Sequence, residues 1–136
     1  MKRILSLSLT VVLLLALVIP AGATEADSGI SPRYTYISTV STNLSISNLG
    51  IATCPATCFA TNISSVKLTC RLQQYKNGVW TTIRTWTDTG ANMGSISQSV
   101  AVYSGYTYRT YISCYVYDAT GAIVETAACY GPQRTY

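Results

Sequence analysis

The sequence predicts an all-β protein that folds as a single antiparallel β-sandwich of about seven strands, similar to immunoglobulin or fibronectin type III domains. Beyond the first 23 residues, threonine, serine, tyrosine and valine dominate, and these residue types favour a pleated, half-buried surface. Short apolar-polar segments recur at roughly even spacing between turn residues, and leucine and alanine are too sparse for an amphipathic helix. A small closed antiparallel barrel is the alternative arrangement of the same strands.

The strand segments begin at Tyr34, and turn residues separate each one from the next. The first segment is long enough for two short strands joined near Ser41 and Thr42. We predict strands at residues 34–47, 50–60, 65–75, 79–88, 94–102, 106–117 and 122–130.

Two stretches predict tight hairpins. Lys76-Asn77-Gly78 lies between two strand-like runs, and an Asn-Gly pair tolerates the positive φ angles that such a turn requires. The second turn is expected at residues 118–121, with the sequence DATG. Between these strands, the run VKLTCRL alternates apolar and polar residues, which predicts that Val66 and its alternate neighbours face the core.

The N-terminus predicts export. Lys2 and Arg3 precede an apolar-rich run over residues 4–19, and the small residues Ala21 and Ala23 stand where a signal peptidase reads the chain. This run is short for a membrane span of about 20 apolar residues. We therefore expect a signal peptide at residues 1–23, a flexible leader at 24–33 and the sandwich domain at 34–136, secreted and without membrane attachment.

The stretch GYTYRTYISCYVYD, residues 105–118, divides its tyrosines between two faces of one predicted strand. Tyr106 and Tyr108 fall on the face that we expect to be buried, where one of them is placed to form a tyrosine corner. Tyr111, Tyr115 and Tyr117 fall on the other face. They either pair with neighbours across the sheet or form a platform for a sugar or a protein.

Trp80 and Trp86 lie six residues apart on one predicted strand, so alternation places them on the same face as Arg84. Either one tryptophan is buried against the core, or the pair is exposed around the arginine and stacks on a ligand. The candidate ligand-binding residues are therefore Trp80, Arg84, Trp86, Tyr111, Tyr115 and Tyr117.

Five cysteines follow the predicted signal peptide: Cys54, Cys58, Cys70, Cys114 and Cys129. In an exported protein they predict disulfides, and the odd number leaves at least one thiol over or shared between chains. A bridge from Cys54 or Cys58 to Cys114 is typical of the immunoglobulin pattern. A pair between Cys70 and Cys114, on neighbouring strands, is the alternative.

Composition argues against several classes of function. The expected mature chain has seven basic and five acidic residues that are spread along it, so we expect no nucleic-acid partner. The chain contains no histidine, which removes the commonest general base, and Asp88 and Asp118 are interpreted as turn residues. The Cys54–Cys58 spacing is not typical of a zinc site. We expect no enzyme activity, no cofactor and no metal.

Several stretches resemble a group of short secreted proteins of unknown function from Gram-positive, Firmicutes-type bacteria. The resemblance is carried by ISPRYTYIS, by LQ…NGVWTTIRTW, and by SGYTYRTY followed by YDATG. It implies an immunoglobulin-like or fibronectin-like sandwich, and it supplies no activity and no site residues.

The sequence leaves two hypotheses on function. The first is a secreted, non-catalytic interaction module that binds a cell-envelope glycan or a protein through exposed aromatic side chains. The second is a structural or self-associating extracellular protein without a small ligand, assembled through edge strands and the odd cysteine.

Overall fold

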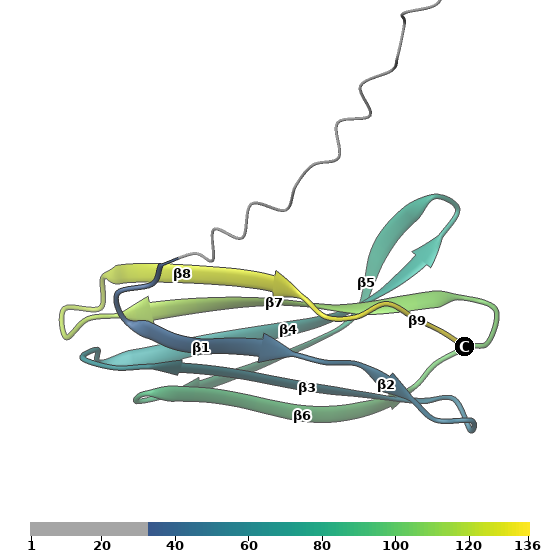
Figure 1. Ribbon diagram of the computed structural model, residues 1–136, viewed down its shortest axis with the longest axis horizontal. Helices are drawn as coiled ribbons and strands as arrows, with labels where there is room; N and C mark the ends of the chain where they lie inside the picture. Colours follow the sequence, from purple (N-terminus) through teal and green to yellow (C-terminus); the bar gives the residue numbers. More distant parts are fainter. Residues whose placement is uncertain (1–32) are drawn as a thin grey trace, which may run out of the picture. The chain divides into compact units, whose positions relative to one another are not determined.

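Two antiparallel sheets face each other in the computed structural model, which describes residues 33–136 (Figure 1). One sheet has β3 (Ile51–Ala60) at its centre, β1 (Ile37–Thr42) and β2 (Ser45–Ile46) on one side and β6 (Met93–Ala101) on the other. The second sheet has the order β5 (Val79–Gly90), β4 (Ser65–Lys76), β7 (Thr107–Tyr117) and β8 (Ile123–Tyr130), with β9 (Arg134–Thr135) beside β7.

The predicted all-β sandwich is confirmed, and the barrel alternative is wrong because the two sheets do not close on one another. The first predicted segment is indeed two strands, β1 and β2, whereas the short strand β9 was not predicted. The predicted signal peptide and all but the last residue of the predicted leader lie outside the described residues.

Both predicted turns are present. Asn77 and Gly78 have φ angles of 52° and 79°, as a tight hairpin requires. The carboxylate of Asp118 accepts hydrogen bonds from the backbone N–H groups of Thr120 and Ala122, so this aspartate is a turn residue as predicted. In Figure 1 the tip of the β4–β5 hairpin stands clear of the rest of the two sheets.

The core lies between small residues on one sheet and large residues on the other. Every second residue of β3 from Ala52 to Ala60 is buried, and each of these five is alanine or cysteine. The facing strand β4 contributes Leu68 and Leu72, both fully buried. Gly94 on β6 completes this fit, because a Cβ atom built there would lie 2.6 Å from the Cβ atom of Leu68.

A disulfide joins the central strands of the two sheets. Cys58 on β3 bonds Cys114 on β7, which confirms the predicted immunoglobulin-like bridge. The alternative pair of Cys70 with Cys114 is wrong. Cys54 and Cys70 are buried free thiols, and Cys129 is a half-buried one. Burial raises the pKa of Cys54 to about 12 and that of Cys70 to about 11, so both stay protonated at neutral pH.

The predicted tyrosine corner is formed by Tyr108. Its side chain is fully buried, and its hydroxyl donates a hydrogen bond of 2.6 Å to the carbonyl oxygen of Tyr103, five residues upstream. The same hydroxyl accepts a hydrogen bond of 3.1 Å from Nε2 of Gln74 on β4. Tyr108 therefore ties the connection between β6 and β7 to the second sheet, whereas Tyr106 only packs at the edge of the core.

Carboxylates connect the two sheets at both open edges of the sandwich. At one edge, Glu125 on β8 accepts hydrogen bonds of 2.6 to 2.9 Å from the backbone N–H groups of Thr35, Tyr36 and Ile37. At the other edge, Asp88 within β5 accepts one of 2.9 Å from the backbone N–H of Ser95 on β6. The interpretation of Asp88 as a turn residue is therefore wrong.

Replacing Glu125 with glutamine is expected to lower the free energy of unfolding at neutral pH by about 1 kcal/mol. The expected effect is this small because Glu125 is only half-buried, and solvent weakens the interactions of its charge. Burial raises the pKa of the Glu125 carboxyl, but the three N–H donors outweigh burial, so the net shift is downward. A lowered native pKa means that this stabilisation is present above the ordinary value of 4.5 and is lost as the pH falls through the native value.

Urea unfolding of the wild type and Glu125→Gln at pH 7 and at about pH 3 measures this difference. We expect the two proteins to differ at pH 7 and to converge in acid. Thr126→Gln, at an exposed neighbouring position, serves as the control and leaves both midpoints unchanged. An equal difference at both pH values would show that the carboxylate is not responsible.

Candidate functional site

The outer face of the β5–β4–β7–β8 sheet carries four of the six predicted site residues. Trp80, Tyr111, Tyr115 and Tyr117 all lie on this face. Trp80 is paired with exposed Tyr75, and the three tyrosines alternate along β7 with buried residues that point into the core. Arg84 and Trp86 do not lie there, so the predicted tryptophan pair around an arginine is not formed.

A β-bulge separates the two tryptophans. Leu72 is paired with Arg84, but the next residue of β4, Gln73, is paired with Thr82, so Ile83 is an extra residue in β5. One inserted residue reverses the alternation of side chains beyond it.

The two tryptophans therefore have different surroundings. Trp86 lies opposite buried Cys70 and packs against the core. Trp80 lies opposite Tyr75 on the outer face. Arg84, opposite buried Leu72, is exposed at the core-facing side of the edge strand.

Rings and guanidinium groups on the outer face form a continuous stack, which we call the aromatic–arginine ladder. Its central contact is Arg109, whose guanidinium carbon lies 4.1 Å from the ring centroid of Trp80 and 4.2 Å from that of Tyr130. Beyond Trp80, the ring of Tyr75 has its centroid 5.1 Å away. The members of the ladder are Tyr75, Trp80, Arg109, Tyr130, Tyr111 and Arg71.

The other end of the ladder is built in the same way. Tyr130 and Tyr111 have ring centroids 4.8 Å apart, and the guanidinium of Arg71 lies 5.8 Å from the ring of Tyr111. Each contact of this kind is worth about 0.5–1 kcal/mol at an exposed site. Together these contacts favour the stacked arrangement of the rings and the guanidinium groups.

Hydrogen bonds orient the two arginines. Nε of Arg109 donates a bond of 2.9 Å to Oε1 of Gln73, its neighbour on β4. One terminal nitrogen of Arg71 donates a bond of 3.2 Å to Oγ of Ser113. Both arginine residues are half-buried.

An open hollow of about 350 Å³ lies at the Trp80 end of the ladder, lined by Tyr75, Trp80, Thr107 and Gln133. Tyr75 is 44% exposed, so a ligand can reach the rings. The Thr107 hydroxyl forms a hydrogen bond of 2.9 Å with that of Thr135 on β9. The hollow thus combines two ring surfaces with hydroxyl and amide groups.

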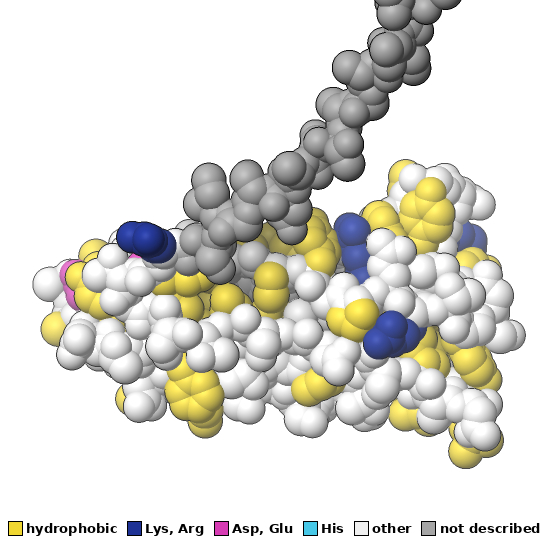
Figure 2. Space-filling view, in the orientation of Figure 1, with side chains coloured by type: hydrophobic (Ala, Val, Ile, Leu, Met, Phe, Trp, Pro, Cys, Tyr) yellow, Lys and Arg dark blue, Asp and Glu magenta, His cyan; other side chains and the backbone are white. Residues whose placement is uncertain are grey.

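The outer face is positively charged. Lys67, Arg71 and Arg109 project from it. Asp88 and Glu125 are paired with buried residues and lie at the core-facing edges instead. Figure 2 shows hydrophobic and basic side chains next to one another at the base of the β4–β5 hairpin; the acidic atoms visible in this view lie at the opposite end of the domain, beside a further basic side chain.

Tyr115 and Tyr117 share the face but lie beyond the ladder. Tyr115 is paired with Lys67 and Thr126, two alternate positions further along β7 than Tyr111. Tyr117 is half-buried near the end of the same strand. The predicted set therefore includes only two ladder residues, Trp80 and Tyr111.

Tyr75, Arg109, Tyr130 and Arg71 were missed as site residues. The sequence did carry a signal for two of them: a two-residue turn at Asn77-Gly78 places Tyr75 directly opposite Trp80. Alternation along β7 puts Arg109 on the face of Tyr111. Nothing in the sequence indicates that Tyr130 reaches both of these side chains, because that contact depends on how β8 pairs with β7.

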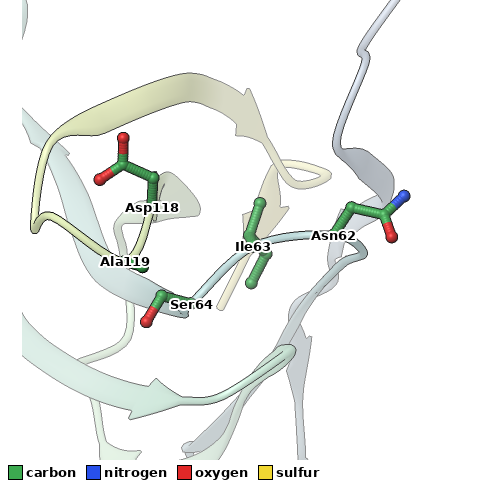
Figure 3. Close-up of a pocket in the computed structure, with 5 residues that line it drawn as sticks. All are labelled: Asn62, Ile63, Ser64, Asp118 and Ala119. Carbon is green, nitrogen blue, oxygen red and sulfur yellow. The ribbon is translucent and has the colours of Figure 1, made fainter.

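A second hollow, of about 410 Å³, lies between the β3–β4 and β7–β8 connections (Figure 3). Its polar side chains do not converge: Asn62 and Asp118 point away from each other in Figure 3. The Asp118 carboxylate is already bonded within its own turn, which lowers its pKa, mainly through the Thr120 hydroxyl. This hollow offers a ligand no aromatic surface.

A third hollow, of about 140 Å³, lies beside Tyr108 and the strand β6. Arg84 lines it together with Val100 and Val102, so this predicted site residue lies beside the third hollow and not on the outer face. The polar groups of Tyr108 and Gln74 there are bonded to each other. Of these three hollows, the one beside the ladder has the most features of a binding site.

Within residues 33–136, no cluster of three or more histidine, cysteine, aspartate or glutamate side chains is arranged to hold a metal ion. The same part of the chain contains no helix that is long and apolar enough to span a membrane. Comparison with known proteins finds no family model that matches the chain and no curated protein that matches it.

Proposed function

We propose that this protein is an exported, non-catalytic module that binds a carbohydrate through the outer face of the β5–β4–β7–β8 sheet. The single observation that supports this most is the hollow formed by Tyr75, Trp80, Thr107 and Gln133. Aromatic rings offer a flat apolar surface to the C–H face of a sugar, and neighbouring hydroxyl and amide groups bond its hydroxyls. A sugar is amphipathic in the same way as this hollow.

The ladder supports the proposal because it positions the rings in advance. Trp80 is stacked on Arg109, and the Gln73 side chain orients that arginine. A side chain that is already ordered loses little conformational entropy when a ligand binds. A site of this kind on rigid strands suits weak, repeated contacts with a polysaccharide.

Export is supported by the predicted signal peptide at residues 1–23 and by the disulfide between Cys58 and Cys114. Disulfides form and persist in oxidising compartments and are rare in the cytosol. A secreted or extracellular location would place the outer face within reach of cell-envelope glycans.

The absence of catalysis is inferred from the available acids and bases. The chain has no histidine, and the three acidic side chains within residues 33–136 each accept hydrogen bonds from backbone N–H groups. Glycoside hydrolysis requires two carboxylates that face each other across the bound sugar. Asp88, Asp118 and Glu125 instead stabilise edges and a turn.

Self-association through an odd cysteine has less support. Cys54 and Cys70 are fully buried in the core, out of reach of a second chain. Cys129 is paired with buried Ile112, so it lies on the core-facing side of β8 and is half-buried. Binding through the outer face needs no rearrangement of these residues.

Replacing Trp80 or Tyr75 with alanine is expected to weaken carbohydrate binding about tenfold or more, because each change removes a stacking surface. The measurement is a glycan array followed by pull-down with purified peptidoglycan. Tyr103→Ala is the matched control, since Tyr103 is a 79% exposed tyrosine outside the ladder, and we expect it to bind normally. The proposed function would be refuted if the wild type bound no glycan, or if Trp80→Ala and Tyr75→Ala bound glycan as tightly as the wild type.

A further inference from the structure

We infer that the bound sugar carries an anionic group, a carboxylate or a phosphate, which the terminal nitrogens of the Arg109 guanidinium bind. This inference rests on the proposed carbohydrate-binding function and specifies the class of ligand. It is drawn from the contacts of Arg109, from the charges around it and from its position beside the hollow.

Arg109 is held on three sides. Trp80 and Tyr130 cover its guanidinium at 4.1 and 4.2 Å, and Gln73 accepts the hydrogen bond from Nε. A guanidinium has five N–H donors, and four of them belong to the two terminal nitrogens. Among residues 33–136, Nε is the only atom of this guanidinium that donates a hydrogen bond.

The free donors form the planar fork that binds a carboxylate or a phosphate through two parallel hydrogen bonds. Because the ring stacking and the bond to Gln73 already fix this fork, binding costs little ordering entropy. A lysine at the same position would provide the charge without the flat surface or the fork.

Among the described residues, the charge of Arg109 has no carboxylate partner on its face. Asp88 and Glu125 lie at the core-facing edges and bond to backbone N–H groups, and Asp118 is engaged in its own turn. Gln73 supplies only a neutral amide. A buried or half-buried cation surrounded by rings favours an anion from outside.

Trp80 links this cation to the hollow, since its ring stacks on Arg109 and also lines the hollow. A sugar stacked in the hollow would therefore have its substituents beside the guanidinium. Arg71 is diagonal to Arg109 on the neighbouring strand, a relation that separates two residues by about 7–8 Å. An anionic polysaccharide with charges on successive sugars can contact both arginines.

The same face is a poor match for a nucleic acid. Within residues 33–136 its basic side chains are Lys67, Arg71 and Arg109, whereas binding to DNA depends on neutralising many closely spaced phosphates. The combination of few, well-separated cations with tyrosine rings and hydroxyl groups favours an anionic glycan.

Binding of the purified protein to polygalacturonate, to its methyl ester and to a glycosylated ribitol-phosphate polymer tests the inference by calorimetry. The methyl ester keeps the sugar backbone but has no charge, and the third polymer replaces the carboxylate with phosphate. We expect measurable binding to at least one of the anionic polymers, weaker binding to the ester, and an affinity that falls as salt is added.

Arg109→Gln should lower the affinity for the anionic polymer about 10- to 100-fold, because charge-assisted hydrogen bonds are lost. Arg109→Lys keeps the charge and should recover only part of the affinity. Arg84→Gln removes an equal charge from an exposed position off the outer face, and it should leave the affinity unchanged. Thermal unfolding of each variant verifies that it is folded.

The outcomes separate this inference from the proposed function. Equal binding of polygalacturonate and its ester, lost in Trp80→Ala but kept in Arg109→Gln, would overturn the anionic ligand and leave carbohydrate binding intact. Binding of DNA as tight as that of the anionic polymers would show attraction by charge alone and would also overturn the inference. No binding to a charged or a neutral glycan would overturn both.

Discussion

Replacing both Cys58 and Cys114 with alanine is expected to lower the free energy of unfolding by about 4 kcal/mol. The disulfide closes a loop of 56 residues, and removing it allows the unfolded chain many more conformations. Because small domains are stable by only about 5–15 kcal/mol, this single bond accounts for a large share of the total.

Urea unfolding of the double variant, and of the wild type with and without reductant, measures the effect. We expect reductant to destabilise the wild type by a similar amount and to leave the double variant unchanged. Cys129→Ala, which removes a half-buried free thiol, is the control and should have a small effect. A wild type that is insensitive to reductant in urea would contradict the prediction.

Replacing Tyr108 with alanine is expected to cost about 4 kcal/mol, since it removes both a fully buried ring and its hydroxyl. Tyr108→Phe should cost about 2 kcal/mol, because it removes only the hydroxyl and leaves the carbonyl of Tyr103 and the amide of Gln74 without this partner. The difference between the two variants separates ring packing from hydrogen bonding.

Thermal and denaturant unfolding of both variants provides the measurement. Tyr106→Phe is the matched control: Tyr106 begins the same run of tyrosines but is only half-buried, and we expect a change within about 0.5 kcal/mol. If Tyr106→Phe were the more damaging substitution, the assignment of the tyrosine corner to Tyr108 would be wrong.

Both of these features lie beneath the candidate binding face. Cys114 and Tyr108 are on β7, the strand that also carries Arg109 and Tyr111 on its other side. The bridge and the corner therefore hold the strand from which the central part of the ladder projects. A site on such a strand keeps its geometry better than a site on a loop.

The arrangement of strands could be predicted from the sequence because each signal is local. Alternation over residues 66–72 places Val66, Leu68, Cys70 and Leu72 on the core face, although Thr69 is also buried on the other face, and Asn77-Gly78 specifies a tight turn by its tolerance of positive φ. The inward and outward sets of tyrosines on β7 follow from the same period of two residues.

From the sequence, the possible disulfide pairs could be reduced to a few, but the pair that forms could not be identified. Several pairs place one cysteine on each of two strands, and only the alignment of the sheets brings Cys58 opposite Cys114. Likewise, Asp88 and Glu125 bond to strands of the other sheet, a contact that no spacing along the chain reveals.

The sequence by itself determined the class of fold, the main hairpins, and the division of the tyrosines between two faces, since these depend on neighbours a few residues apart. Only the tertiary structure decided the candidate site. One inserted residue, Ile83, reverses the alternation of β5, so Trp86 turns toward the core while Trp80 meets Arg109. The physical reason is that packing between segments distant in the sequence sets a bulge and a strand register. The alternation of apolar and polar residues along one strand does not indicate that packing.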